Sequence, residues 1–196
     1  LPASFADFRR DAEKRLPRFL FDYIDGGAGA EVTLRRNTAD WEAVSLAQKA
    51  LVDASKMDCS VELFGEKLAM PLVLAPVGMG GMTARRGEVQ AKRAADKAGV
   101  PFCLSTVGIC TLEEVGAVSD RPAWFQLYML KDRGIVQEIL ARAWDNGVRT
   151  LAFTIDLAVL GTRYRDIRNG MAGGLGPWGR FRSGALDYAL HPRWAW

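Results

Sequence analysis

Histidine and cysteine are scarce in this chain of 196 residues. It has one histidine, His191, and three cysteines, Cys59, Cys103 and Cys110, which form no Cys-x-x-Cys pair. An odd and scattered set of cysteines excludes a disulfide framework as the basis of the fold and favours a reducing compartment. No metal site is predicted.

Long hydrophobic runs and a strong charge imbalance are also missing. The longest uncharged stretch, 68–84, contains Pro71, Pro76 and several glycines, so it predicts a strand and a loop rather than a membrane span. The N-terminal residues are charged and show no signal-peptide hydrophobic region. A net charge of +3 is too small to indicate a nucleic-acid partner, and 49% hydrophobic with 25% charged residues is typical of a soluble globular domain.

The first seventy residues predict helices and no strong strand. Residues 4–15 have apolar side chains at helical spacing behind a possible cap, Ser4. A second helical segment begins at Pro17 and is ended by the glycines that follow residue 25. A third helix is predicted over 30–43, with a polar break near Asn37. We therefore interpret 1–70 as a helical N-terminal extension.

After residue 70, short apolar segments alternate with helical ones. Strands are predicted at 71–76, 101–105, 124–128 and 150–156, and helices at 87–98, 111–118 and 132–146. This alternation predicts successive βα units with parallel strands. The strands are apolar throughout, which is typical of parallel strands that are covered on both faces.

Two architectures accommodate such units, a doubly wound sheet and a (β/α)8 barrel. The first loop, PVGMGGM, is not a Gly-x-Gly-x-x-Gly motif, which weakens the doubly wound interpretation. Polar residues follow at the carboxyl ends of the other strands, where (β/α)8 barrel enzymes place their sites: Ser105, Gln126, Tyr128, Thr154 and Asp156. We therefore predict an α/β fold of the (β/α)8, or TIM, barrel class.

Only half of such a barrel is visible in the sequence. Eight βα units need roughly 250 residues, and residues 71–162 supply four. A half-barrel leaves strand edges and an apolar face uncovered. We therefore expect the chain to be the N-terminal half of a larger domain, completed by a second chain, a cleaved piece or a further region. Residues 163–196 then form a mobile loop that is rich in arginine and tryptophan.

The segment 151–166 combines the clearest site features. Thr154 and Asp156 lie two residues apart at the end of an apolar strand, so their side chains point to the same face. Burying a carboxylate there is unfavourable unless a partner pairs with it. Alternatively, Asp156 caps the following helix or loop.

A series of motifs in order gives a more specific indication: PRFLFDYIDGGA, TLRRN, MPLVLAPVGMGGM, RRGEVQ, LSTVGICTLEEV, WFQLYMLKDRG, FTIDLAVLGTRYRDIRNGM and HPRWAW. Through them the chain resembles the FMN-dependent α-hydroxy acid dehydrogenase and oxidase family over almost its whole length. It is most similar to the bacterial respiratory L-lactate dehydrogenases, and less so to mandelate dehydrogenase and glycolate oxidase. The family fold is a (β/α)8 barrel preceded by helices, in agreement with the independent prediction.

The resemblance assigns six residues to FMN: Pro76, Val77, Gly78, Ser105, Gln126 and Thr154. It implies that the backbone of the first three lies against the flavin ring, where glycine permits a close approach. The last three match residues that hydrogen-bond the pyrimidine edge of the flavin, which hydroxyl and amide groups can serve. Gly78 favours a dehydrogenase, since oxygen-reactive family members tend to have alanine there.

The resemblance also implies roles around the substrate. Tyr23 and Arg163 match residues that bind the substrate carboxylate, and Tyr128 matches a second tyrosine of the active site. Asp156 matches the aspartate that pairs with the catalytic histidine, which takes the substrate's proton while two electrons pass to the flavin. That histidine lies beyond residue 196, and His191 does not match it. The chain alone is therefore expected to be inactive.

The end of the chain, 170–196, suggests a membrane contact. It contains three of the six tryptophans together with several arginines, a composition that suits either a surface loop or a membrane boundary. Membrane-associated lactate and mandelate dehydrogenases carry an insertion here, where they meet quinone. The resemblance thus implies a peripheral protein on the cytoplasmic side of the inner membrane, or in the cytoplasm.

The resemblance therefore implies oxidation of an L-2-hydroxy acid, L-lactate to pyruvate, with electrons passed to quinone by a homotetramer. An oxidase or a mandelate dehydrogenase on the same scaffold is the alternative within enzymes. A non-catalytic half-barrel with a structural or membrane-binding role is the alternative outside them.

Overall fold

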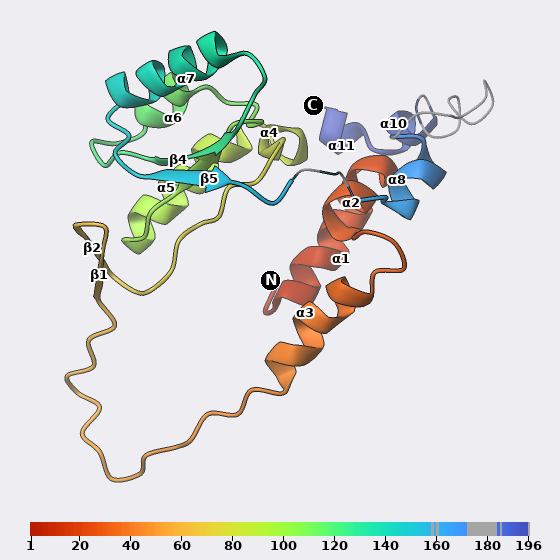
Figure 1. Ribbon diagram of the computed structural model, residues 1–196. Helices are drawn as coiled ribbons and strands as arrows, with labels where there is room; N and C mark the ends of the chain where they lie inside the picture. The colour runs from red at the N-terminus through yellow and green to blue at the C-terminus, as the bar shows by residue number, and fades with distance from the viewer. Residues whose placement is uncertain (158, 160, 172–183, 185, 196) are drawn as a thin grey trace. The chain divides into compact units, whose positions relative to one another are not determined.

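The computed structural model describes residues 1–157, 159, 161–171, 184 and 186–195. It divides into two compact units, one of Leu1–Leu51 with Val159–Trp196 and one of Val52–Ala158. The elements of the first unit are α1 (Phe5–Arg15), α2 (Arg18–Asp25), α3 (Val32–Glu42), α8 (Tyr164–Asn169), α10 (Asp187–Leu190) and α11 (Pro192–Ala195). Those of the second are β1 (Val61–Leu63), β2 (Glu66–Leu68), α4 (Gly80–Thr83), α5 (Gly87–Ala98), β3 (Cys103–Ser105), α6 (Leu112–Gly116), β4 (Trp124–Tyr128), α7 (Arg133–Asp145) and β5 (Leu151–Thr154) (Figure 1).

The three N-terminal helices form where the sequence predicts them. Ser4 caps α1 in a capping box, in which Asp7 donates its backbone N–H to the Ser4 hydroxyl and its carboxylate accepts the Ser4 backbone N–H. Pro17 precedes α2, and Gly26 ends it. α3 runs on through Asn37, so the expected break there is wrong. Asparagine is only a moderately poor helix former, and one such residue does not interrupt eleven.

A short hairpin precedes the barrel strands and was not predicted. β1 and β2 pair antiparallel across a two-residue turn, Phe64–Gly65, whose φ angles are 51° and 78°. Two positive φ values are characteristic of the tight turn that suits hairpin twist, and glycine adopts one of them without strain. Strands of three residues are too short for an alternating pattern to be recognised in the sequence.

The central sheet has three parallel strands in the order β3-β4-β5. The register pairs Ser105 with Gln126 and Tyr128 with Thr154. Parallel strands that alternate with helices confirm the predicted βα units and are consistent with a partial (β/α) barrel. The strand predicted at 71–76 is wrong in extent, because only Leu74 forms a parallel bridge, to Phe102. Pro71 and Pro76 lack the N–H groups that would extend the ladder in either direction.

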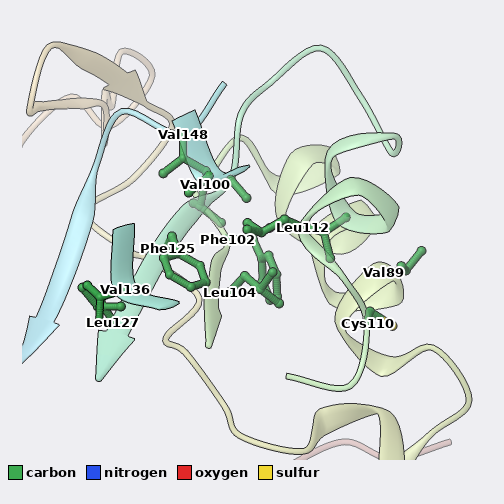
Figure 2. Close-up of a cluster of buried hydrophobic side chains, with 14 residues drawn as sticks. Val89, Val100, Phe102, Leu104, Cys110, Leu112, Phe125, Leu127, Val136 and Val148 are labelled. Atoms are coloured by element: carbon green, nitrogen blue, oxygen red, sulfur yellow. The ribbon is translucent and has the colours of Figure 1, made fainter. Parts of the chain in front are cut away.

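The core lies between one face of this sheet and three helices. Buried side chains of α5, α6 and α7 pack against Phe102 and Leu104, in and just before β3, and against Phe125 and Leu127 of β4. Figure 2 shows Phe125 and Leu104 close together within this cluster. Because side chains alternate along a strand, Ser105 and Gln126 belong to the opposite face. The core therefore leaves one sheet face for polar residues.

β5 differs from its prediction in two ways. It ends at Thr154, so Ile155 and Asp156 lie beyond it rather than within a strand 150–156. The apolar side chains of this segment are also not buried, since Leu151 and Phe153 in β5 are 46% and 47% exposed and Ile155, directly after it, is 80% exposed. In the described part of the chain β5 is an edge strand that pairs only with β4, and an edge strand lacks the neighbours that cover a central one.

Candidate functional site

Three residues assigned to the flavin edge form one hydrogen-bonded row. The Ser105 hydroxyl donates to Gln126 Oε1 at 3.1 Å, and Gln126 Nε2 donates to the Thr154 hydroxyl at 2.8 Å. The parallel register, in which Ser105 lies opposite Gln126, brings them together. Gln126 is only 3% exposed, and Ser105 is also buried. The structure thus fixes a hydroxyl, an amide and a second hydroxyl side by side across three strands.

This row can both donate and accept hydrogen bonds. Gln126 Nε2 has two hydrogens and uses one for Thr154, and the Thr154 hydroxyl, while accepting, still has its own hydrogen to donate. The pyrimidine edge of a flavin alternates carbonyl oxygens with an N–H group. A mixed donor and acceptor set that is already oriented by its own hydrogen bonds fits such an edge.

Thr106 was not singled out from the sequence, yet it fixes the middle of the row. Its backbone N–H donates to Gln126 Oε1 at 3.2 Å, its hydroxyl donates to the backbone oxygen of Gln126 at 2.5 Å, and that hydroxyl accepts the backbone N–H of Tyr128 at 3.1 Å. These bonds hold the end of β4 against the loop after β3. A threonine directly after a strand-end serine is too common a pattern to indicate this role.

The segment Pro76–Gly78 leads from the Leu74 bridge into α4. Directly after it, the Met79 backbone N–H donates to the Val107 backbone oxygen at 2.9 Å. The loop that carries Pro76, Val77 and Gly78 is thereby tied to the loop that follows Ser105. Their predicted place beside a flavin ring is compatible with this position at the carboxyl end of the strands.

Tyr128 and Asp156 follow the row toward the strand ends. Tyr128 is the last residue of β4 and lies opposite Thr154. Asp156 is exposed, and within the described part of the chain no residue forms a hydrogen bond or ion pair with it. Among the described residues, its carboxylate caps no backbone N–H group. His191, by contrast, contacts Asp187, with Nδ1 2.7 Å from the backbone oxygen and 3.3 Å from Oδ1.

In the other unit, the structure brings Tyr23 and Arg163 together. Arg163 Nη2 donates to the backbone oxygens of Tyr23 and, at 2.8 Å, of Gly26, while its Cζ lies 4.9 Å from the centre of the Tyr23 ring. Arg163 Nε forms an ion pair with Asp166 at 3.2 Å. The carbonyl groups at the end of a helix have no partner within it, so Arg163 completes the end of α2.

Arg165, two residues later, joins an acidic cluster. It forms ion pairs with Asp25 at 2.8 Å and with Glu31 at 2.7 Å, and Arg9 forms another with Asp25 at 2.5 Å. The hydrogen bond from Arg9, with help from Arg165, holds the pKa of Asp25 below its usual value. The hydrogen bond from Arg165 does the same to the pKa of Glu31. These pairs hold the start of α8 against the end of α2.

The described residues near the C-terminus form an aromatic cluster. Tyr188 and Trp194 stack at 5.5 Å between ring centres, and Phe19 meets each edge-on at 5.8 and 6.4 Å. Trp178, Arg180, Phe181, Arg182 and Trp196, part of the predicted membrane segment, lie outside the described residues. Within the residues that are described, no helix combines the length and apolarity needed to cross a membrane.

A hollow on the second unit lies at the opposite ends of the strands. It is lined by residues of the β1–β2 hairpin and by the first residues of β4 and β5, and the Trp124 indole N–H donates to Glu66 Oε1 there at 2.8 Å. Since barrel enzymes react at the carboxyl ends of their strands, this hollow is not the candidate site.

Comparisons with known proteins agree with the family seen in the sequence. The profile of the FMN-dependent dehydrogenase family matches residues 12–196. The chain is 55% identical over 194 residues to an L-lactate dehydrogenase of Alcaligenes faecalis, covering 99% of this chain and 50% of that protein. It is 56% identical over 191 residues to an L-lactate dehydrogenase of Xanthomonas campestris pv. campestris (strain B100), covering 97% and 48%. The chain spans about half the length of the curated relatives it matches.

Solved structures give the same result. The monotopic membrane protein (S)-mandelate dehydrogenase matches with a TM-score of 0.86 and 35% identity, over 97% of this chain and 50% of that one. Mandelate oxidase matches with a TM-score of 0.81 and 35% identity, over 91% and 51%.

Proposed function

Because the chain belongs to the FMN-dependent dehydrogenase family, we propose that it forms the N-terminal half of an enzyme that oxidises L-lactate to pyruvate. The hydrogen-bonded row of Ser105, Gln126 and Thr154 carries this proposal, since it offers a flavin edge its donors and acceptors at the carboxyl ends of the strands. The greater similarity to L-lactate dehydrogenases than to mandelate enzymes supports lactate as the substrate.

FMN, when bound, supplies the acceptor for two electrons from the substrate. Ser105, Gln126 and Thr154 would hold its pyrimidine edge, and the backbone of Pro76, Val77 and Gly78 would lie against its ring. Because the three polar side chains are already hydrogen-bonded to one another, little further ordering is needed when the cofactor binds.

Asp156 would orient a histidine that the other half of the barrel supplies, and would stabilise the imidazolium formed when that histidine removes the substrate's proton. Its exposed carboxylate, without a partner among the described residues, is available for this. Tyr128, at the end of the neighbouring strand, would contact the substrate oxygens. We propose that without this histidine the chain does not turn over substrate.

Tyr23 and Arg163 would bind the substrate carboxylate. Arg163 uses Nη2 for its two backbone bonds and Nε for the pair with Asp166. Nη1 has no partner within the described ranges, so it is the nitrogen that can meet a carboxylate oxygen. The contacts of Nη2 and Nε orient the guanidinium group that carries Nη1.

We further propose that 1–70 forms a helical extension, 71–162 the first four βα units, and 163–196 a membrane-contacting loop of a homotetramer that delivers electrons to quinone at the cytoplasmic side of the inner membrane. The stacked Tyr188 and Trp194 support an interfacial role, since aromatic residues favour the membrane boundary. Liposome co-sedimentation of the full-length enzyme with and without 170–196 tests this. Equal sedimentation of both forms would contradict it.

The catalytic proposal is tested on the full-length protein. It should purify with a flavin absorption spectrum and reduce a quinone analogue with L-lactate faster than with (S)-mandelate. Release of one hydrogen peroxide per pyruvate would instead identify an oxidase. A colourless protein that takes up no added FMN would refute the assignment.

A further inference from the structure

Glu88 is a buried acid that the proposed reaction does not use. It is the second residue of α5 and only 3% exposed. Its Oε1 accepts two backbone N–H groups, one from Gly81 and one from Ile109, each at 2.9 Å. Glutamates are seldom fully buried, and they are so only where donors replace water.

The two N–H groups belong to different loops. Gly81 lies in α4, which begins two residues after the segment Pro76–Gly78, and α4 packs beside α5 (Figure 1). Ile109 lies in the loop that follows Ser105, the first residue of the polar row. One carboxylate oxygen therefore joins the loops that follow two successive strands of the barrel. The bond between Met79 and Val107 joins them a second time.

Three glycines lie where α4, the start of α5 and the loop of Ile109 approach one another closely. A Cβ added to Gly80 would lie 3.2 Å from Glu88 Oε1, and one added to Gly81 would lie 2.7 Å from Ile109 Cβ. A Cβ on Gly87 would lie 2.5 Å from the backbone oxygen of Gly80. A side chain at Gly81 or Gly87 would therefore force the neighbouring backbone or Ile109 to move, so these two glycines permit the close approach of the loops.

The carboxylate is also kept ionised. Burial raises the pKa of Glu88, but the N–H groups of Ile109, of Glu88 itself and of Gly81 outweigh burial and hold the pKa below its usual value. Hydrogen bonds to a charged acceptor are shorter and stronger than neutral ones. Burial and the neighbouring Glu88 together raise the pKa of the Cys110 thiol, which therefore stays neutral beside it.

We propose that Glu88 is a positioning residue for the cofactor site: it fixes the loop of Pro76–Gly78 against the loop that follows Ser105, and so sets the backbone beside the flavin ring relative to the ligands of its pyrimidine edge. This rests on the proposed function. Glu88 touches neither cofactor nor substrate, and acts through the backbone of both loops.

The test compares Glu88→Ala, Glu88→Gln and Asp96→Asn in the full-length protein. Asp96 is the matched control, because it lies on the same helix in a partly buried network with Lys92 and Ser119 but contacts neither loop. Glu88→Ala should weaken FMN binding by the apoprotein about tenfold and lower kcat about 10- to 100-fold with a nearly unchanged KM. Hydrogen exchange at the Gly81 and Ile109 amides should become faster, and Glu88→Gln, which keeps an acceptor oxygen, should recover part of each effect.

Asp96→Asn should lower the melting temperature without changing FMN affinity or the flavin spectrum. If Glu88→Ala behaves in the same way, the role of Glu88 is structural and the inference is wrong. If the unsubstituted protein binds no FMN, the proposed function fails, whereas FMN binding that is unaffected by Glu88→Ala refutes the positioning role alone.

Discussion

Replacing Gln126 by leucine should separate its effect on folding from its effect on the cofactor. The amide accepts hydrogen bonds from the Ser105 hydroxyl and the Thr106 N–H and donates one to Thr154. Leucine has a similar size but makes none of these bonds. The Thr106 N–H keeps a second acceptor, the backbone oxygen of Gln126 at 3.0 Å, so two buried or partly buried hydroxyls lose a partner.

The magnitude follows from those two groups. A buried polar group left unsatisfied destabilises by about 1–3 kcal/mol, and hydroxyls can rotate toward other partners, so we expect a loss of about 2–3 kcal/mol in the free energy of unfolding. The flavin edge would also lose the second amide hydrogen and the orientation of both hydroxyls. A loss of about 1.5–3 kcal/mol of binding free energy weakens FMN affinity about 10- to 100-fold.

Gln137→Leu is the matched control, because it makes the same chemical change on the exposed face of α7. Urea unfolding of the apoprotein measures stability without the contribution of bound FMN, and titration of the apoprotein with FMN measures affinity. The control should change the free energy of unfolding by less than about 0.5 kcal/mol. If the two variants have the same FMN affinity, the polar row does not bind the flavin and the reasoning fails.

Three further predictions concern other groups of the full-length protein. Lys92→Ala should lower the free energy of unfolding by about 3 kcal/mol, because Lys92 is 0% exposed and its ion-pair partner, Asp96, would remain partly buried without a countercharge. In the same urea experiment, Arg93→Ala, at an exposed position, should change the free energy of unfolding little. The pKa of Asp25 in the folded state is lowered from 3.8, so its ionised form stabilises the fold above about pH 4, and this stabilisation is lost as the pH falls through the lowered pKa. Asp25→Asn should therefore flatten the acid side of a plot of melting temperature against pH. An unchanged slope would contradict the ion pairs of Asp25. Burial raises the pKa of Cys103 to about 11, so iodoacetamide at pH 8 should modify exposed Cys59 first, and mass spectrometry showing Cys103 modified equally fast would disprove its burial.

Local rules predicted the elements that local chemistry determines. Ser4 and Asp132 cap helices as short polar side chains do. The apolar run 124–128 is a strand with the predicted bounds because it lies at the centre of its sheet, with a neighbour on each side. The row of Ser105, Gln126 and Thr154 was also predictable from the sequence. The carboxyl ends of parallel strands lie at one edge of the sheet, so polar residues at these ends come close together.

Tertiary context determined the rest. Residues 71–76 look like a strand, but prolines at both ends leave a single bridge at Leu74. The sequence around Arg163 does not indicate its backbone partners at the end of α2, because those contacts span 137 residues or more. In the sequence, Glu88 is simply a glutamate in the first turn of a predicted helix, a position that the helix dipole alone would explain. Its two acceptor bonds depend on loops that sequence spacing does not place.

The exposed side chains of β5 have a consequence for how the complete barrel folds. Leu151 and Phe153 lie opposite Phe125 and Leu127 in the register, so they continue the apolar face that α5, α6 and α7 cover on the other strands. Burying a large apolar side chain fully contributes about 1.5–3 kcal/mol, and roughly half of that gain is still to be made at each of these two. The stability of this sheet is therefore shared with whatever packs on β5. Unfolding should be cooperative across the whole barrel, and a substitution in either half should move a single transition rather than one of two.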